Sequence, residues 1–260
     1  MEKYYSVITS PYTIIISIIT ILYFFKEKIL DFLLHNFLKL IHKYQKKMRP
    51  KRIILVRHGN SVANNNYDIL QRVPDNKVHL SEKGIKQAKE AGQRLKQIIG
   101  NESIQFYVSP YTRTKETYEN IMESFKDNYT ECIYVTSLRE QEYGNLQREM
   151  DKQFEEQKKV GVFFYRFING ESGADVHARM SIFLQYLFRR ILSIDYHSFD
   201  NIVIVSHELT IKFFMMNFMN LPVTELDNIK KIDNAQFWTL EKNEYGKYIL
   251  KDDIFINKKE

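Results

Sequence analysis

Short apolar runs that alternate with helical stretches limit the fold of this 260-residue chain more than any other feature. Runs of four or five mostly apolar residues are typical of strands that are buried on both faces of a sheet. They lie at Ile53–Val56, Ile104–Val108 and Ile202–Val205, with a shorter run at Ile133–Val135. Helices are expected between and after them, at Lys83–Ile99, Pro110–Phe125, Asp175–Leu192 and Leu209–Met219. This alternation predicts an α/β fold with three layers, α/β/α, around a mainly parallel central sheet.

Polar residues of chemical interest follow the predicted strands. Arg57 and His58 come directly after the first strand, and His207 comes shortly after Ile202–Val205. Because ligands of such sheets bind beyond the carboxyl ends of the strands, we expect these side chains to lie close together. Arg113 lies near the start of a predicted helix, where the helix dipole also favours an anion.

These residue types suit a phosphoryl group. A neutral imidazole is a nucleophile at pH 7, so His58 is a candidate to attack phosphorus. The guanidinium groups of Arg57 and Arg113 match phosphoryl oxygens, and His207 can donate a hydrogen bond to them. An acid must then protonate the leaving oxygen.

The N-terminal segment predicts a membrane anchor. Residues 4–25 contain no charged residue, and 22 helical residues rise about 33 Å, enough for a hydrocarbon core of about 30 Å. We therefore expect a transmembrane helix within residues 1–28. A helix that starts only at Pro11 would be short for a span, and a cleaved signal peptide or a buried core helix are the alternatives.

Charge is distributed unevenly along the chain. Residues 1–52 hold ten Lys/Arg against three Asp/Glu, whereas residues 53–260 hold 28 against 29. The nearly neutral body argues against a nucleic-acid partner. The positive-inside rule predicts a single-pass membrane protein with its catalytic domain in the cytosol. Residues 29–51 are expected to form a basic amphipathic juxtamembrane segment, or else an ordinary helix packed on the domain.

Five segments, in order, resemble motifs of the histidine phosphatase superfamily, in its phosphoglycerate-mutase-like branch. Leu55–Asn64 contains the pattern R-H-G-x-S-x-x-N, and Ser109–Thr117 the pattern S-P-x-x-R-x-x-x-T. Leu138–Gly144 is similar to the acid-bearing segment L-x-E-x-x-x-G, and it is followed by Gly170-Glu171-Ser172 and Val205-Ser206-His207. The aromatic segment Phe163–Phe167 looks most like the plant and protist phosphatases of this branch.

The resemblance implies a role for each matching residue. His58 would be the phosphorylated nucleophile, Arg57, Asn64, Arg113 and His207 would bind the phosphoryl group, and Glu140 would be the proton donor. Glu208 stands where this branch usually has Gly, and it is the alternative proton donor. The family needs no metal or cofactor. The single Cys132 excludes a disulfide framework and a cysteine zinc site, and the remaining histidines lack metal-ligand spacing.

Residues 52–260 are therefore expected to form a histidine phosphatase domain that hydrolyses phosphate monoesters. The substrate would be a phosphorylated small molecule or a phosphoprotein. A phosphoglycerate-type mutase is an alternative, although residues 62–68 contain no Thr-Gly pair and Arg166 is followed by Phe167 instead of a second arginine. A catalytically silent membrane adaptor that only binds phosphate is another. We expect residues 65–77 and 147–169 to determine the substrate.

Overall fold

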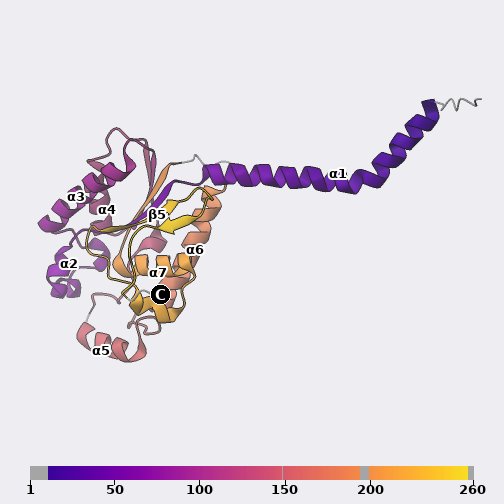
Figure 1. Ribbon diagram of the computed structural model, residues 1–260. Helices are drawn as coiled ribbons and strands as arrows, with labels where there is room; N and C mark the ends of the chain where they lie inside the picture. Colours follow the sequence, from indigo (N-terminus) through magenta and orange to yellow (C-terminus); the bar gives the residue numbers. More distant parts are fainter. Residues whose placement is uncertain (1–10, 148, 194–198, 257–260) are drawn as a thin grey trace, which may run out of the picture. The chain divides into compact units, whose positions relative to one another are not determined.

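The computed structural model describes residues 11–147, 149–193 and 199–256. The chain divides into two compact units, Met1–Met48 and Arg49–Glu260. The second unit contains a six-stranded sheet in the order β3-β2-β4-β1-β5-β6 (Figure 1). Its strands are β1 (Arg52–Arg57), β2 (Ile104–Val108), β3 (Thr130–Tyr134), β4 (Asn201–Ser206), β5 (Phe237–Lys242) and β6 (Tyr248–Leu250).

The sheet is mixed but mostly parallel, which confirms the predicted fold class. Strands β3, β2, β4 and β1 are parallel neighbours. Strand β5 pairs antiparallel with β1, and β6 pairs antiparallel with β5. The hairpin between β5 and β6 closes with a hydrogen bond from Gly246 N to Asn243 O, 2.9 Å long.

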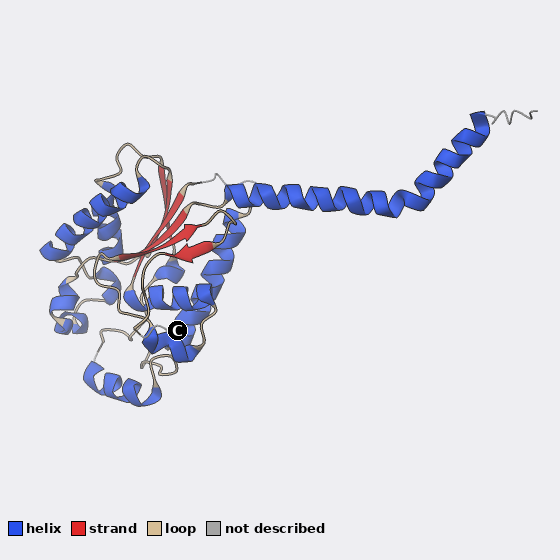
Figure 2. Cartoon of the chain, viewed as in Figure 1, coloured by secondary structure: helices blue, strands red, loops and turns tan. Residues whose placement is uncertain are grey.

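Helices cover both faces of the sheet, as Figure 2 shows. On β1, Ile54 and Val56 pack with α3 (Glu82–Ile99) and α4 (Thr112–Met122). Ile53 and Leu55 point the other way and pack with α6 (Gly173–Ile191) and α7 (Glu208–Met219). All four strand side chains are fully buried, which explains why the strand is apolar at every position instead of alternating.

The helix limits follow from local capping. Ser81 caps α3 by accepting from Gly84 N, and Gly100 ends it at a φ of +62°. Ser172 forms a capping box with Asp175, so α6 begins at Gly173, two residues before the predicted start. The remaining helical elements are α2 (Val62–Asn65), η1 (Tyr67–Gln71), η2 (Asp75–Lys77), η3 (Thr136–Leu138), α5 (Met150–Val160) and η4 (Val223–Asn228).

In the described part of the N-terminal unit, one helix, α1 (Pro11–Met48), includes residues of both predicted N-terminal segments. Within the described residues, no helix has the length and apolar character needed to cross a membrane. The predicted transmembrane helix is thus not found there, and its first part, residues 4–10, lies outside the described residues. The described part of the uncharged run, from Pro11 to Phe25 in α1, rises about 22 Å before Lys26 follows.

Candidate active site

Two histidines meet at the carboxyl edge of the sheet. β1 and β4 are parallel neighbours with Arg57 opposite Ser206, so His58 and His207, which directly follow them, lie at the same edge. Their ring centroids are 5.2 Å apart. Both side chains are buried, so the neutral forms are favoured over charged ones.

The surroundings of His58 define its tautomer. Its Nδ1 lies 2.7 Å from the carbonyl oxygen of Gly59. A carbonyl can only accept, so Nδ1 carries the ring proton and Nε2 keeps its lone pair. Burial lowers the pKa of His58 well below its ordinary value, and the charges of Arg113 and Arg57 lower it further. His58 is therefore a neutral imidazole with a nucleophilic Nε2 at neutral pH.

The glycine after His58 is required by close packing. A Cβ on Gly59 would lie 2.5 Å from the backbone oxygen of Gly84 in the first turn of α3. No real Cβ approaches an oxygen so closely. The chain can therefore leave β1 against α3 only with glycine at this position.

His207 presents one unpaired ring nitrogen. Its Nε2 lies 2.8 Å from the Ser109 hydroxyl. Its Nδ1 is buried without a hydrogen-bond partner among the residues that the structure describes, and it lies 4.0 Å from Glu140 Oε2. Burial is the main cause that lowers the pKa of His207 well below its ordinary value.

Glu140 has the properties of a general acid. Burial raises its pKa to about 7, although Arg113 and a hydrogen bond from Gln141 N oppose this rise. Its carboxyl group is therefore partly protonated at neutral pH. Glu208, the alternative proton donor, instead places Oε2 at 3.0 Å from Arg57 Nη1 in an ion pair.

Three of the predicted phosphate ligands, Arg57, Asn64 and Arg113, line one cavity with His58, whereas the buried His207 is not among the residues that line it. Arg57 ends β1, and Arg113 lies in the first turn of α4, with its guanidinium paired to Asp75 at 2.8 Å. Asn64 lies in α2 and accepts from Ser61 N through Oδ1, at 2.9 Å. This bond leaves the Asn64 amide nitrogen to act as a donor.

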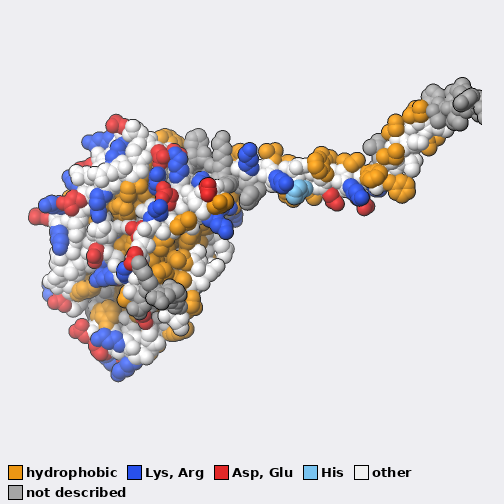
Figure 3. Space-filling view, viewed as in Figure 1, with side chains coloured by type: hydrophobic (Ala, Val, Ile, Leu, Met, Phe, Trp, Pro, Cys, Tyr) orange, Lys and Arg blue, Asp and Glu red, His pale blue; other side chains and the backbone are white. Residues whose placement is uncertain are grey.

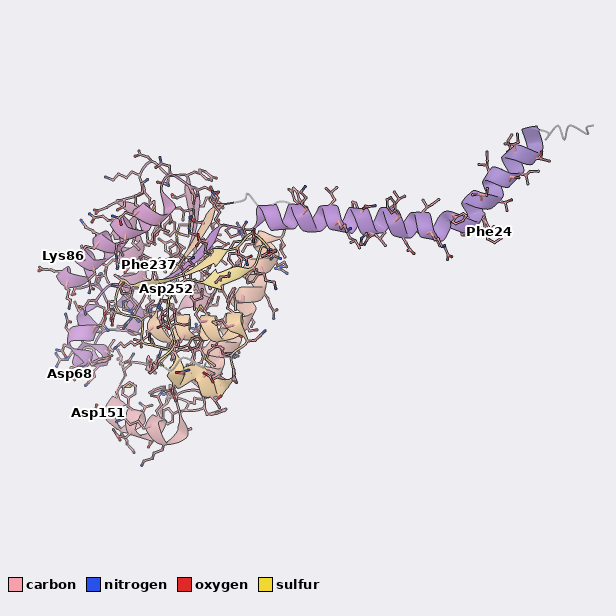
Figure 4. The ribbon with its side chains drawn as sticks, viewed as in Figure 1. Phe24, Asp68, Lys86, Asp151, Phe237 and Asp252 are labelled. Atoms are coloured by element: carbon pink, nitrogen blue, oxygen red, sulfur yellow. The ribbon has the colours of Figure 1, made fainter. Side chains whose placement is uncertain are left out.

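One cavity of about 320 Å³ brings these groups together. Among its lining residues are Arg57, His58, Asn64, Arg113, Glu140 and Glu208. Both segments that the sequence assigned to the substrate also line it. Tyr67, Leu70 and Asp75 come from the first segment, and Gln147, Phe154, Gln157 and Val162 come from the second. In Figure 4, Asp68 marks the first segment and Asp151 marks α5 in the second.

Sequence reasoning missed several lining residues, among them Asp75, Tyr143 and Lys212. Asp75 follows Pro74 at the start of the short helix η2 and carries no motif. Tyr143 lies inside the acid-bearing motif at a position that the motif leaves open. Across the described part of the chain, no group of three or more His, Cys, Asp or Glu side chains is arranged to hold a metal ion.

Comparison with known proteins identifies the family. The model of the histidine phosphatase superfamily (branch 1) matches residues 53–252. The chain belongs to this superfamily. A phosphoglycerate mutase-like protein of Arabidopsis thaliana is 37% identical over 225 residues, covering 78% of each chain.

Other relatives of this histidine phosphatase are phosphatases by name. A broad-range acid phosphatase of Saccharomyces cerevisiae is 24% identical and covers 78% of this chain and 89% of its own length. The crystal structure of the α-ribazole phosphatase of Shigella flexneri has a similar fold, with a TM-score of 0.60. It is 18% identical and covers 79% of this chain and 96% of that one. Membership of the histidine phosphatase superfamily and the acid-phosphatase relative support an enzyme with phosphatase activity.

Proposed function

We propose that the protein hydrolyses phosphate monoesters through a phosphohistidine formed on His58. The observation that carries this proposal is the neutral His58, whose Nε2 is unprotonated and whose ring lies beside two arginines and a partly protonated Glu140 in one cavity. Arg57 and Arg113 match the charge of the phosphoryl group, so the proposed reaction needs no metal.

The reaction has two steps. His58 Nε2 attacks phosphorus, the bond from phosphorus to the leaving oxygen breaks, and Glu140 gives its proton to that oxygen. Glu140, now a carboxylate, takes a proton from water as the water oxygen attacks the phosphohistidine. The phosphorus–nitrogen bond then breaks, and inorganic phosphate and neutral His58 are formed. His207 Nδ1 and the Asn64 amide would donate hydrogen bonds to the phosphoryl oxygens.

Hydrolysis is favoured over a phosphoglycerate-type mutase by the position of Arg166. Its guanidinium pairs with Asp175 at 2.7 Å and is not among the residues that line the cavity. A mutase needs cations that hold the carboxylate of its substrate. The catalytically silent adaptor is disfavoured because a group that only binds phosphate has no use for an acid with a raised pKa beside an unprotonated imidazole.

A panel of phosphate monoesters tests this function. Purified residues 49–260 should release inorganic phosphate from small monoesters or phosphopeptides. A mutase would transfer the phosphoryl group to a second hydroxyl of the product, and an adaptor would show no turnover. Phosphate release with no phosphorylated isomer in the products is the expected result.

The N-terminal unit favours attachment to a membrane, which we include in the proposal. Large apolar side chains between Ile14 and Tyr44 are exposed along α1, as the orange patches in Figure 3 show. Residues 26–52 add nine Lys/Arg against Glu27 and Asp31. An apolar surface flanked by lysines binds anionic lipid headgroups, and the position of these lysines favours a cytosolic catalytic unit.

Deletion of residues 1–48 should abolish this attachment. The full-length protein should sediment with vesicles that contain phosphatidylserine, whereas residues 49–260 should stay in the supernatant with unchanged phosphatase activity. Protease added to sealed cell membranes with the cytosolic face outward should digest the catalytic unit. Full-length protein that stays in the supernatant with these vesicles would contradict the attachment, and protection from protease would contradict the orientation.

A further inference from the structure

Each of the two arginines of the cavity is held by a backbone carbonyl and a carboxylate. Nη1 of Arg57 donates to the backbone oxygen of Ile232 at 2.7 Å and contacts Glu208 Oε2 at 3.0 Å. Nη1 of Arg113 donates to the backbone oxygen of Asp75 and to Asp75 Oδ1, both at 2.8 Å, and Nη2 of Arg113 donates to Asp75 Oδ2 at 3.3 Å. Each arginine is thus held by one backbone carbonyl and one carboxylate, Arg57 at Nη1 alone and Arg113 at Nη1 and Nη2.

This anchoring leaves a defined edge of each guanidinium for a ligand. The group is planar, and these contacts leave Nε and at least one N–H of Nη2 on the other edge of each guanidinium. Arg57 Nε is buried without a hydrogen-bond partner among the described residues. A buried donor without an acceptor costs free energy, so this edge lacks an acceptor that a phosphoryl oxygen can supply.

Because the two arginine side chains are buried, they need a carboxylate beside them as a counter-charge. The side chains of Arg57 and Arg113 are only 9% and 6% exposed, while those of Glu208 and Asp75 are 25% and 18% exposed. A buried guanidinium without a counter-charge is destabilised and would turn toward water. The carboxylates come from unrelated elements, Glu208 from the first turn of α7 and Asp75 from η2. Two separate parts of the fold therefore provide the same arrangement.

We propose that Asp75 and Glu208 are positioning residues that hold Arg113 and Arg57 with their Nε–Nη2 edges toward the phosphoryl group. This inference rests on the proposed function. It assigns a role to Asp75, which carries no sequence motif, and it makes Glu208 the anchor of Arg57 instead of a proton donor. Neither carboxylate touches the substrate in this role.

Inhibition by vanadate, which mimics the phosphoryl group in transfer, tests the anchors directly. In Asp75→Ala and in Glu208→Ala, the inhibition constant for vanadate should rise on the order of tenfold, since a charge-assisted contact to vanadate is weakened. In the same two variants, kcat/KM for phosphate monoesters should fall. The ratio of rates for phenyl phosphate and nitrophenyl phosphate should stay unchanged, because proton donation is not affected. Glu90→Ala, which removes an exposed carboxylate on α3 outside the residues that line the cavity, is the control and should match wild type.

A conservative variant separates positioning from general damage. Asp75→Asn keeps an acceptor oxygen for Arg113 and should bind vanadate within about threefold of wild type. Vanadate inhibition that is unchanged or stronger in the alanine variants would overturn the inference. The carboxylates would then have no effect on vanadate binding or would oppose it. A changed rate ratio in Glu208→Ala would overturn the anchoring role of Glu208. A wild-type protein without turnover would instead refute the proposed function.

Discussion

Substitution of His58 by alanine should reduce turnover of every phosphate monoester by at least about 10³-fold, the scale expected when a nucleophile is removed. The reason is geometric: His58 has an unprotonated Nε2 and lines the same cavity as Arg57 and Arg113. The folded state should persist, because the side chain lines the cavity and contributes little to the two main apolar clusters. Steady-state rates, together with a thermal melt, measure both effects.

Two further measurements make this result specific. His79→Ala removes a histidine that is paired with Glu116 outside the cavity, and it should keep near wild-type activity. A rapid quench of wild type with labelled substrate should trap a phosphoprotein that is stable to base and labile to acid, as a phosphohistidine is. Retention of more than a few per cent of activity in folded His58→Ala would remove His58 from the role of nucleophile.

The sheet and its helices were predictable because their signals are local. The run at Ile53–Val56 is apolar at every position, so it reports burial on both faces without knowledge of its neighbours. Ser81 and Gly100 mark the ends of α3 by capping chemistry that depends on adjacent residues only. The strand ends then place His58 and His207 at one edge, because parallel strands share their direction.

The parts of the fold and the site that the sequence did not predict depend mainly on contacts between residues that are distant in the chain. Asp75 pairs with Arg113 across 38 positions, and no local pattern distinguishes it from any other loop aspartate. Helix α5 is polar on most of its surface, so its sequence resembles a solvated loop. It begins after Glu149, which has a positive φ. The carboxylate of Glu208 was ambiguous from sequence because its partner, Arg57, belongs to another strand end.

The same limit applies to the N-terminal helix. The length of an uncharged run suggests a span, whereas crossing a membrane also requires a continuous helix through all of that run. The structure describes this helix from Pro11, and Lys26 ends the uncharged run after Phe25. Residues 4–10 of the run lie outside the described residues.

Substitution of Glu140 by glutamine should separate substrates by their leaving groups. Phenyl phosphate and alkyl phosphates need a proton on the departing oxygen, so their kcat should fall by about 10²–10⁴-fold, the usual contribution of a general acid. Nitrophenyl phosphate forms a stable anion and should slow far less. Glutamine has nearly the same shape as glutamate but cannot supply the proton, so packing around Gln141 and Thr210 is preserved. Rates for a series of aryl phosphates measure this effect.

The pH profile provides an independent signature of the same proton. Because the protonated form of Glu140 is required and its pKa is about 7, the rate for phenyl phosphate should be high below pH 7 and fall as the pH rises through it. His58 stays neutral over this range, since its pKa is well below its ordinary value. In Glu140→Gln the fall near pH 7 should disappear. Glu208→Gln should keep both the fall and the wild-type order of substrates. If the fall near pH 7 and the wild-type order of substrates are lost in Glu208→Gln but kept in Glu140→Gln, Glu208 is the proton donor. The raised pKa of Glu140 would then serve another purpose.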